Sequence, residues 1–139
     1  MTKARENQTY SDARYGVVQR AFTVPLTKDD VATAGTLVEA FITLPVKASI
    51  HAFGIQSAAS DVVVATSDYF ELRTSAGAKL ATLVFSADIT LGSGEATSVA
   101  PETATTVAKN QPLVCCVGTN VGVSGSIYYF VDYREQYSA

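Results

Sequence analysis

Two runs near the C-terminal end, Pro112-Leu-Val-Cys-Cys-Val117 and Ser126-Ile-Tyr-Tyr-Phe-Val-Asp-Tyr133, decide the fold class of this chain. Both are short and rich in β-branched and aromatic residues, which favour extended strands. Residues 118–125 between them contain three glycines and predict a turn. The two runs therefore predict two β-strands.

The same pattern recurs toward the N-terminus, where short apolar runs are separated by turn-forming residues. No apolar period extends over more than about two helical turns, so a parallel α/β fold is disfavoured. We expect residues 86–104, rich in Gly, Ser, Thr and Ala, to form a long surface loop with at most a short strand near Ile89. In total, about eight strands in an antiparallel sandwich or barrel are predicted, the earlier ones within 16–25, 35–45, 48–56, 69–74 and 79–85, with 61–65 as a possible short strand. Within 48–56, alternation predicts Ile50 on one face and His51, Phe53 and Ile55 on the other.

Length and composition indicate one globular domain. The chain has 139 residues, of which 47% are hydrophobic and only 17% charged. So few charges suggest that part of the surface is buried in an assembly. No apolar run reaches the roughly 20 residues that span a bilayer, and the first residues do not have the apolar segment of a secretory signal. We therefore expect a soluble protein that is not exported by that route, with no membrane partner.

Residues 1–15 predict an extended polar arm in front of a β-sandwich domain at 16–139, because they have no apolar period. Residues 1–28 carry a net charge of +3 and the rest of the chain −6, so the arm could be guided onto an acidic neighbour. The sequence contains no dense basic patch interleaved with aromatic residues, so we expect no nucleic-acid partner. Tyrosine and arginine contribute strongly to protein interfaces, so the expected anchors of the arm are Arg5, Tyr10, Arg14 and Tyr15.

The residues do not form a recognisable catalytic or metal motif. His51 is the single histidine, and no nucleophile signature accompanies it. Cys115 and Cys116 are neighbours, which disfavours a disulfide between them, and with His51 they show no zinc-ligand spacing. Residues 91–95 have two glycines but not the lysine of a phosphate-binding loop. We therefore expect no enzyme activity, no cofactor and no metal.

Four tyrosines cluster at the C-terminal end and suggest a protein-binding surface. Alternation places Tyr129 and Tyr133 on one face of the last strand, with Tyr128 and Phe130 on the other. One face fills the core and the other needs cover. Together with the arginine that follows the strand, the predicted interface at this end of the chain comprises Tyr129, Tyr133, Arg134 and Tyr137.

The runs 35–45, 112–117 and 126–134 together resemble small bacteriophage virion proteins of the capsid decoration, or cement, type. The likeness covers roughly residues 16–134. It implies an antiparallel β-sandwich or jelly roll on the outside of a phage head, often as a homotrimer, bound to several subunits of the major capsid protein. In that role we expect the N-terminal arm to reach a neighbouring subunit, with many copies adding avidity.

Two other function classes remain open from the sequence. Another phage structural component, in the tail, neck or fibre, would have the same fold and differ in its copy number per particle. A carbohydrate-binding sandwich would instead show a groove lined by Tyr69 or by residues 86–104. Binding of the isolated domain to glycans would distinguish that class from the structural ones.

Overall fold

A computed structural model describes residues 17–23, 26–27, 38–58, 61–66, 68–103, 105–117 and 126–136. These residues form strands and turns and no helix, which confirms the predicted all-β class. Accordingly, this part of the chain has no helix long and apolar enough to cross a membrane. Its strands in chain order are β1 (Val18–Phe22), β2 (Leu26–Thr27), β3 (Val38–Thr43), β4 (Ala48–Ser57), β5 (Val62–Val64), β6 (Tyr69–Thr74), β7 (Lys79–Val84), β8 (Ile89–Leu91), β9 (Ala96–Val99), β10 (Thr106–Val107), β11 (Pro112–Val117) and β12 (Ser126–Glu135).

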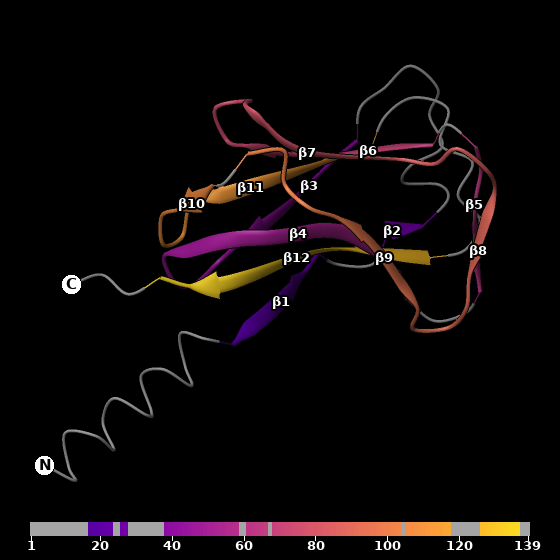
Figure 1. Cartoon of the computed structure of the whole chain (residues 1–139), viewed down its shortest axis with the longest axis horizontal. Helices are drawn as coiled ribbons and strands as arrows, with labels where there is room; N and C mark the ends of the chain where they lie inside the picture. Colours follow the sequence, from indigo (N-terminus) through magenta and orange to yellow (C-terminus); the bar gives the residue numbers. More distant parts are fainter. Residues whose placement is uncertain are drawn as a thin grey trace, which may run out of the picture.

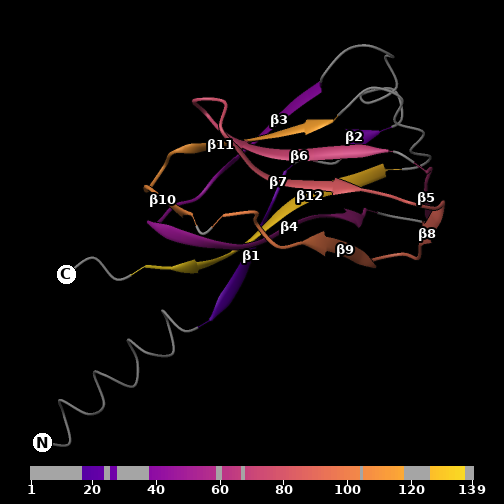
Figure 2. The same ribbon diagram turned by 45° about the horizontal axis from the view of Figure 1, so that its top comes forward.

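The strands form two layers and a small third sheet. Sheet A has the order β1-β12-β4-β10, with β2 also on β12 and β9 also on β4. Sheet B has the order β3-β11-β6-β7, and β5 pairs with β8 in a two-stranded sheet. In Figures 1 and 2, sheet B lies over sheet A, and β5 and β8 close one end of the two layers.

The antiparallel pairs are nested one inside the other along the chain. β6 pairs with β7, β4 with β9, β3 with β11, and β1 with β12, so each pair encloses the one before it. This is one long hairpin, and its successive pairs alternate between the two sheets. A long hairpin rolled into two sheets is the jelly-roll arrangement of Greek-key strands. The predicted sandwich or jelly roll is therefore confirmed.

A bulge in β4 determines which of its side chains reach the core. Tyr133 of β12 lies opposite Ile50, but Asp132 lies opposite Ala52, so His51 is the extra residue on β4. The predicted alternation was wrong here, since Ile50, Phe53 and Ile55 are all buried while His51 is exposed. The inserted residue reverses the parity of the strand, which a strict period of two cannot represent.

The core between the sheets is built around aromatic rings. Tyr129 stacks on Phe53 with ring centroids 5.7 Å apart and meets Phe70 edge-on, also at 5.7 Å. Its hydroxyl donates to the carbonyl oxygen of Cys116 at 3.4 Å. Burial raises the pKa of Tyr129 well above its ordinary value, and burial likewise raises the pKa of the Cys115 thiol. Sheets A and B are thus held together by a dry aromatic centre.

Residues 86–104 form more regular structure than predicted. They contain both β8 and β9, whereas a loop with at most one short strand was expected, so that prediction was wrong. β9 pairs with β4 along Phe53–Gln56, where Gly54 lets the two backbones approach closely. A Cβ at Gly54 would lie 2.9 Å from Ser98 Cα and collide with the carbonyl oxygen of Thr97. Small polar residues can form an edge strand here because a glycine on the partner strand makes room.

Candidate protein-interaction site

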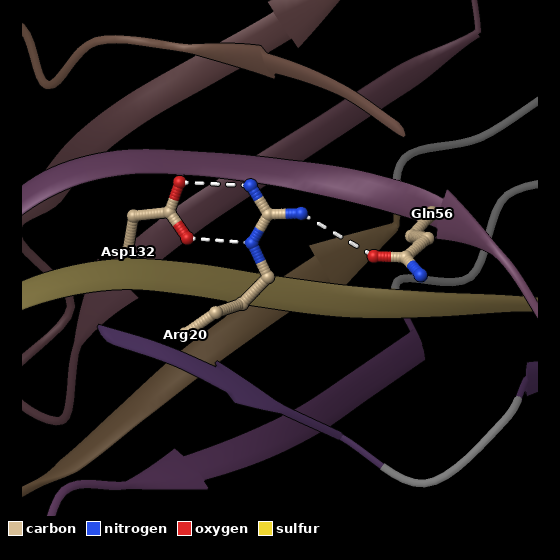
Figure 3. A network of polar contacts seen from close by, with 3 residues as sticks. All are labelled: Arg20, Gln56 and Asp132. Carbon is tan, nitrogen blue, oxygen red and sulfur yellow. Dashed lines mark hydrogen bonds and ion pairs between the residues drawn. The ribbon is translucent and has the colours of Figure 1, made fainter. Parts of the chain in front are cut away.

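A polar network crosses three neighbouring strands on the outer face of sheet A, the face turned away from sheet B. Arg20 of β1 donates from Nε and Nη2 to the two carboxylate oxygens of Asp132 on β12, at 2.6 and 3.0 Å. Its Nη1 donates to Oε1 of Gln56 on β4 at 3.3 Å. Figure 3 shows the guanidinium lying between these two partners. The hydrogen bonds with Asp132 raise the pKa of Arg20, which is charged at any physiological pH.

The same arginine covers an aromatic cluster. Its guanidinium carbon lies 3.8 Å from the centroid of the Phe130 ring, within the range of a cation–π contact. Phe22 of β1 meets Tyr128 edge-on at 5.5 Å and Phe130 at 6.3 Å. Phe130 is fully buried although it lies outside the core between the sheets. The outer face of sheet A therefore has its own apolar layer, covered by side chains of β1.

β1 itself remains exposed. Val17, Val18 and Phe22 are 52%, 45% and 46% accessible, which is high for large apolar side chains. Among the described residues β1 pairs only with β12, so it is an edge strand of sheet A. Its five residues include no lysine or proline, and the pairing with β12 has no register shift. We call this edge, with Val17, Val18 and Phe22, the β1 surface.

Two other edges of the described sheets have features that discourage pairing with a further chain, whereas β3, the second edge of sheet B, is six residues long and pairs with β11 without a register shift. β7 at the edge of sheet B begins with Lys79, and its pairing with β6 is irregular at Arg73. On the far side of β4, β9 and β10 are only four and two residues long. Short strands, irregularities and edge lysines are the usual protection against edge-to-edge association. The β1 surface does not have them either. Because it carries three exposed large apolar side chains, whereas Phe41 is the single one among the described side chains of β3, it is the strongest candidate for an interface.

The structure moves part of the predicted tyrosine patch into the core. Tyr129 and Tyr133 are 0% and 6% exposed, so they cannot contribute to a surface, and their proposed interface role was wrong. The predicted separation from Tyr128 and Phe130 holds, but the tyrosines occupy the inner face, where Tyr133 also donates to Oε1 of Gln19 at 3.0 Å. Period-two alternation separates two faces without saying which one faces the other sheet.

Arg134 keeps a place on the outer face of sheet A. It is partly exposed, lies opposite Val18 in the register, and its Nε is buried without a hydrogen-bond partner. The other predicted interface residues fall outside the described part of the chain: Arg5, Tyr10, Arg14, Tyr15 and Tyr137.

The sequence reasoning missed Arg20 and Phe22, which organise this face. Both lie in the run 16–25, and the alternation of Val18, Arg20 and Phe22 places them on one face. That signal was available, but the partners Asp132 and Phe130 are more than a hundred residues away along the chain.

The described residues contain no group of three or more His, Cys, Asp or Glu side chains that could hold a metal ion. His51 is exposed on the β4 bulge, and Cys115 and Cys116 are both buried thiols that are not joined in a disulfide. Asp88, on the loop before β8, accepts from the backbone N and from Oγ1 of Thr66, both at 2.7 Å, and these hydrogen bonds lower its pKa. The Asp88 carboxylate therefore stabilises the turn at Thr66.

No protein-family model and no curated protein matches the chain. Among solved structures, a chain of the infectious bursal disease virus Gx strain is similar with a TM-score of 0.25 and 14% identity, over 88% of this chain. A chain of the T13 IBDV viral particle is similar with a TM-score of 0.25 and 13% identity, again over 88%. This chain spans 39% and 36% of their lengths. Likenesses this distant carry no argument about function.

Proposed function

We propose that this protein is a virion structural protein, a capsid decoration protein that binds the outside of a phage head through its β1 surface. The observation that carries the proposal is the exposed apolar edge strand β1 of sheet A. Jelly rolls are a common architecture of viral capsid domains, which fits this role. The proposed partner is the major capsid protein, and the proposed assembly is a homotrimer.

The physical basis of binding is addition of a strand together with burial of apolar surface. An extended partner segment next to β1 would satisfy the backbone groups along that edge and cover Val17, Val18 and Phe22. Arg20 is already neutralised by Asp132, so covering it does not bury an unpaired charge. Many copies on one particle would convert a modest single contact into tight attachment by avidity.

The role proposed here involves no reaction and no cofactor. A tail, neck or fibre component would use the same β1 surface and differ in copy number per particle. The copy number of the protein on purified particles distinguishes these locations, because the copy number of a decoration protein is proportional to that of the capsid subunits.

Size-exclusion chromatography with light scattering tests the proposal, on the purified chain alone and mixed with phage heads. We expect a trimer that co-migrates with heads. Val18→Asp places a charge on the β1 surface and should abolish co-migration. The control Val84→Asp alters a similarly exposed valine, 54% against 45%, at the edge of sheet B and should retain co-migration with heads. Undiminished binding of Val18→Asp, or failure of the unmodified chain to bind heads, would refute the proposal.

A further inference from the structure

A groove of about 390 Å³ is present on the outer face of sheet B, the face turned away from sheet A. Its floor includes Val114 of β11, which pairs with Phe41 of β3 on one side and Arg73 of β6 on the other. Because neighbouring strands lie about 4.8 Å apart, Phe41 and Arg73 border the floor from backbones roughly 10 Å apart. The volume falls within the range of small-molecule sites.

One wall of the groove is aromatic. Phe41 is 59% exposed, the highest value among the large apolar side chains of the described residues. Exposed aromatic rings are costly in water unless a partner covers them, and their faces attract C–H groups that carry a partial positive charge. Phe41 therefore offers a stacking platform beside the floor.

The opposite wall is polar but electrically neutral. Nε and Nη2 of Arg73 lie 2.6 and 2.5 Å from Oε2 of Glu71. The Glu71 side chain is 3% exposed, whereas that of Arg73 is 34% exposed and lines the groove. The buried carboxylate thus holds the guanidinium in place and cancels its charge. A neutral wall of this kind presents hydrogen-bond donors without attracting an anion in particular.

Hydroxyl groups and a tight turn complete the groove. The turn between β6 and β7 contributes Thr74, Ser75 and Gly77, and Thr43 contributes a further hydroxyl from β3. Gly77 has a φ of +92° and donates its N–H to the carbonyl oxygen of Thr74 at 2.9 Å. In Figure 1 this turn rises at one end of sheet B. The residues bordering the floor thus combine one aromatic ring, one guanidinium and several hydroxyls.

We propose that this groove binds a neutral saccharide unit of the pyranose type. A sugar ring has one face of C–H groups, which suits Phe41, and a rim of hydroxyls, which suits Arg73 and the hydroxyls of the turn. A purely apolar ligand would leave the polar groups of the opposite wall without hydrogen-bond partners. An anion would gain little, because Glu71 already balances the positive charge of Arg73. The site goes beyond the proposed assembly role and does not depend on it.

This groove differs from the place where a sugar site was expected from the sequence. Neither Tyr69 nor any residue of 86–104 lines it. The β1 surface belongs to sheet A, so attachment through that surface leaves the groove on sheet B open. A head-bound copy could therefore present the groove outward.

Saturation-transfer NMR with the methyl pyranosides of glucose, galactose, mannose and N-acetylglucosamine, at millimolar concentration, tests the inference. We expect at least one sugar to receive saturation from the protein. In amide spectra of the protein, the same sugar should shift the signals of Ser75 and Gly77. Phe41→Ala should raise the Kd of the protein for that sugar roughly tenfold. Arg73→Lys, which keeps a cation beside Glu71 but loses the planar fork, should also weaken binding.

Two matched controls make the outcome specific. Val84→Ala removes an exposed side chain of sheet B outside the groove, and Val18→Asp disables the β1 surface; both should bind the sugar as the unmodified protein does. The inference is overturned if no pyranoside binds, if Phe41→Ala binds unchanged, or if glucuronate binds in clear preference to the neutral sugars. Loss of head binding with retained sugar binding would refute the assembly role alone.

Discussion

The outer faces of the two sheets carry the same chemical pair and use it differently. On sheet A the fork of Arg20 grips both oxygens of Asp132 and lies over Phe130, which closes the face. On sheet B, Nε and Nη2 of Arg73 both contact the same oxygen of Glu71, and the arginine borders an open groove. An arginine–carboxylate pair therefore has no function by itself, because the neighbouring side chains determine whether the pair covers an apolar surface or borders an open one.

The two pairs also differ in how they arise from the chain. Glu71 and Arg73 are two residues apart on one strand, so any extended conformation of β6 places them on the same face. Arg20 and Asp132 are 112 residues apart and meet only when β1 pairs with β12. The Arg20–Asp132 pair therefore forms only when β1 pairs with β12, whereas the Glu71–Arg73 pair requires only that β6 be extended.

We expect the greatest loss of stability from a substitution at Gly54, which lies next to Phe130 on sheet A. In Gly54→Val the new side chain would meet the Thr97 backbone and lie 2.5 Å from Cζ of Phe130. We expect a loss of about 3 kcal/mol or more in the free energy of unfolding, measured by urea denaturation. The control Gly94→Ala has open space and a φ of +77°, so backbone strain alone should cost about 1 kcal/mol. Equal losses at the two glycines would contradict the close β4–β9 approach.

The next prediction compares the two arginines. Arg73→Ala leaves the Glu71 carboxylate, 3% exposed, without its guanidinium, and we expect a loss of about 2–3 kcal/mol. Arg20→Ala leaves Asp132 at 16% exposure, where water can reach the carboxylate, and removes part of the cover of Phe130, for about 1 kcal/mol. Urea denaturation of both variants measures the difference. The reverse order would show that covering Phe130 matters more than pairing Glu71.

A third prediction separates stability from assembly on the β1 surface. Val18→Asp lies on an exposed edge strand, so the free energy of unfolding should change by no more than about 0.5 kcal/mol. Thermal and urea denaturation of the isolated chain measure this, next to the head-binding assay. A large destabilisation would mean that Val18 supports the domain itself, and the loss of binding could then not be assigned to the interface.

The smallest effect is a dependence on pH from the core behind the groove. Burial raises the pKa of Cys115 above the ordinary value of 9.0 and that of Tyr129 above 10.0, so both groups are protonated in the folded state. Their contribution to stability is complete below about pH 9 and is lost as pH rises further, because the unfolded chain then releases protons that the folded chain retains. Denaturation at pH 7.5 and pH 10 measures the loss, which Cys115→Ala should reduce. An unchanged stability between the two pH values would argue against dry surroundings for these groups.

Several features of the fold followed from local patterns. β11 and β12 appear where β-branched and aromatic residues predicted strands, because side-chain crowding at the backbone favours extended conformations locally. β9 was missed because Ala96–Val99 has little apolar character, and its place depends on the space that Gly54 leaves on β4. The bulge at His51 was missed because an inserted residue is defined only by the partner strand.

For the candidate sites, local sequence supplied the alternation that separates Tyr128 from Tyr129, the spacing of Glu71 and Arg73, and the low charge that suggests a surface buried in an assembly. The inward orientation of Tyr129, the contacts of Arg20 with Asp132 and Phe130, and the groove beside Phe41 all depend on how distant strands pair. This division arises because the two kinds of feature depend on interactions over different distances along the chain. Alternation depends on backbone geometry within a few residues, whereas the inner face of a strand and its partners across a sheet are set by pairings between segments far apart in the chain.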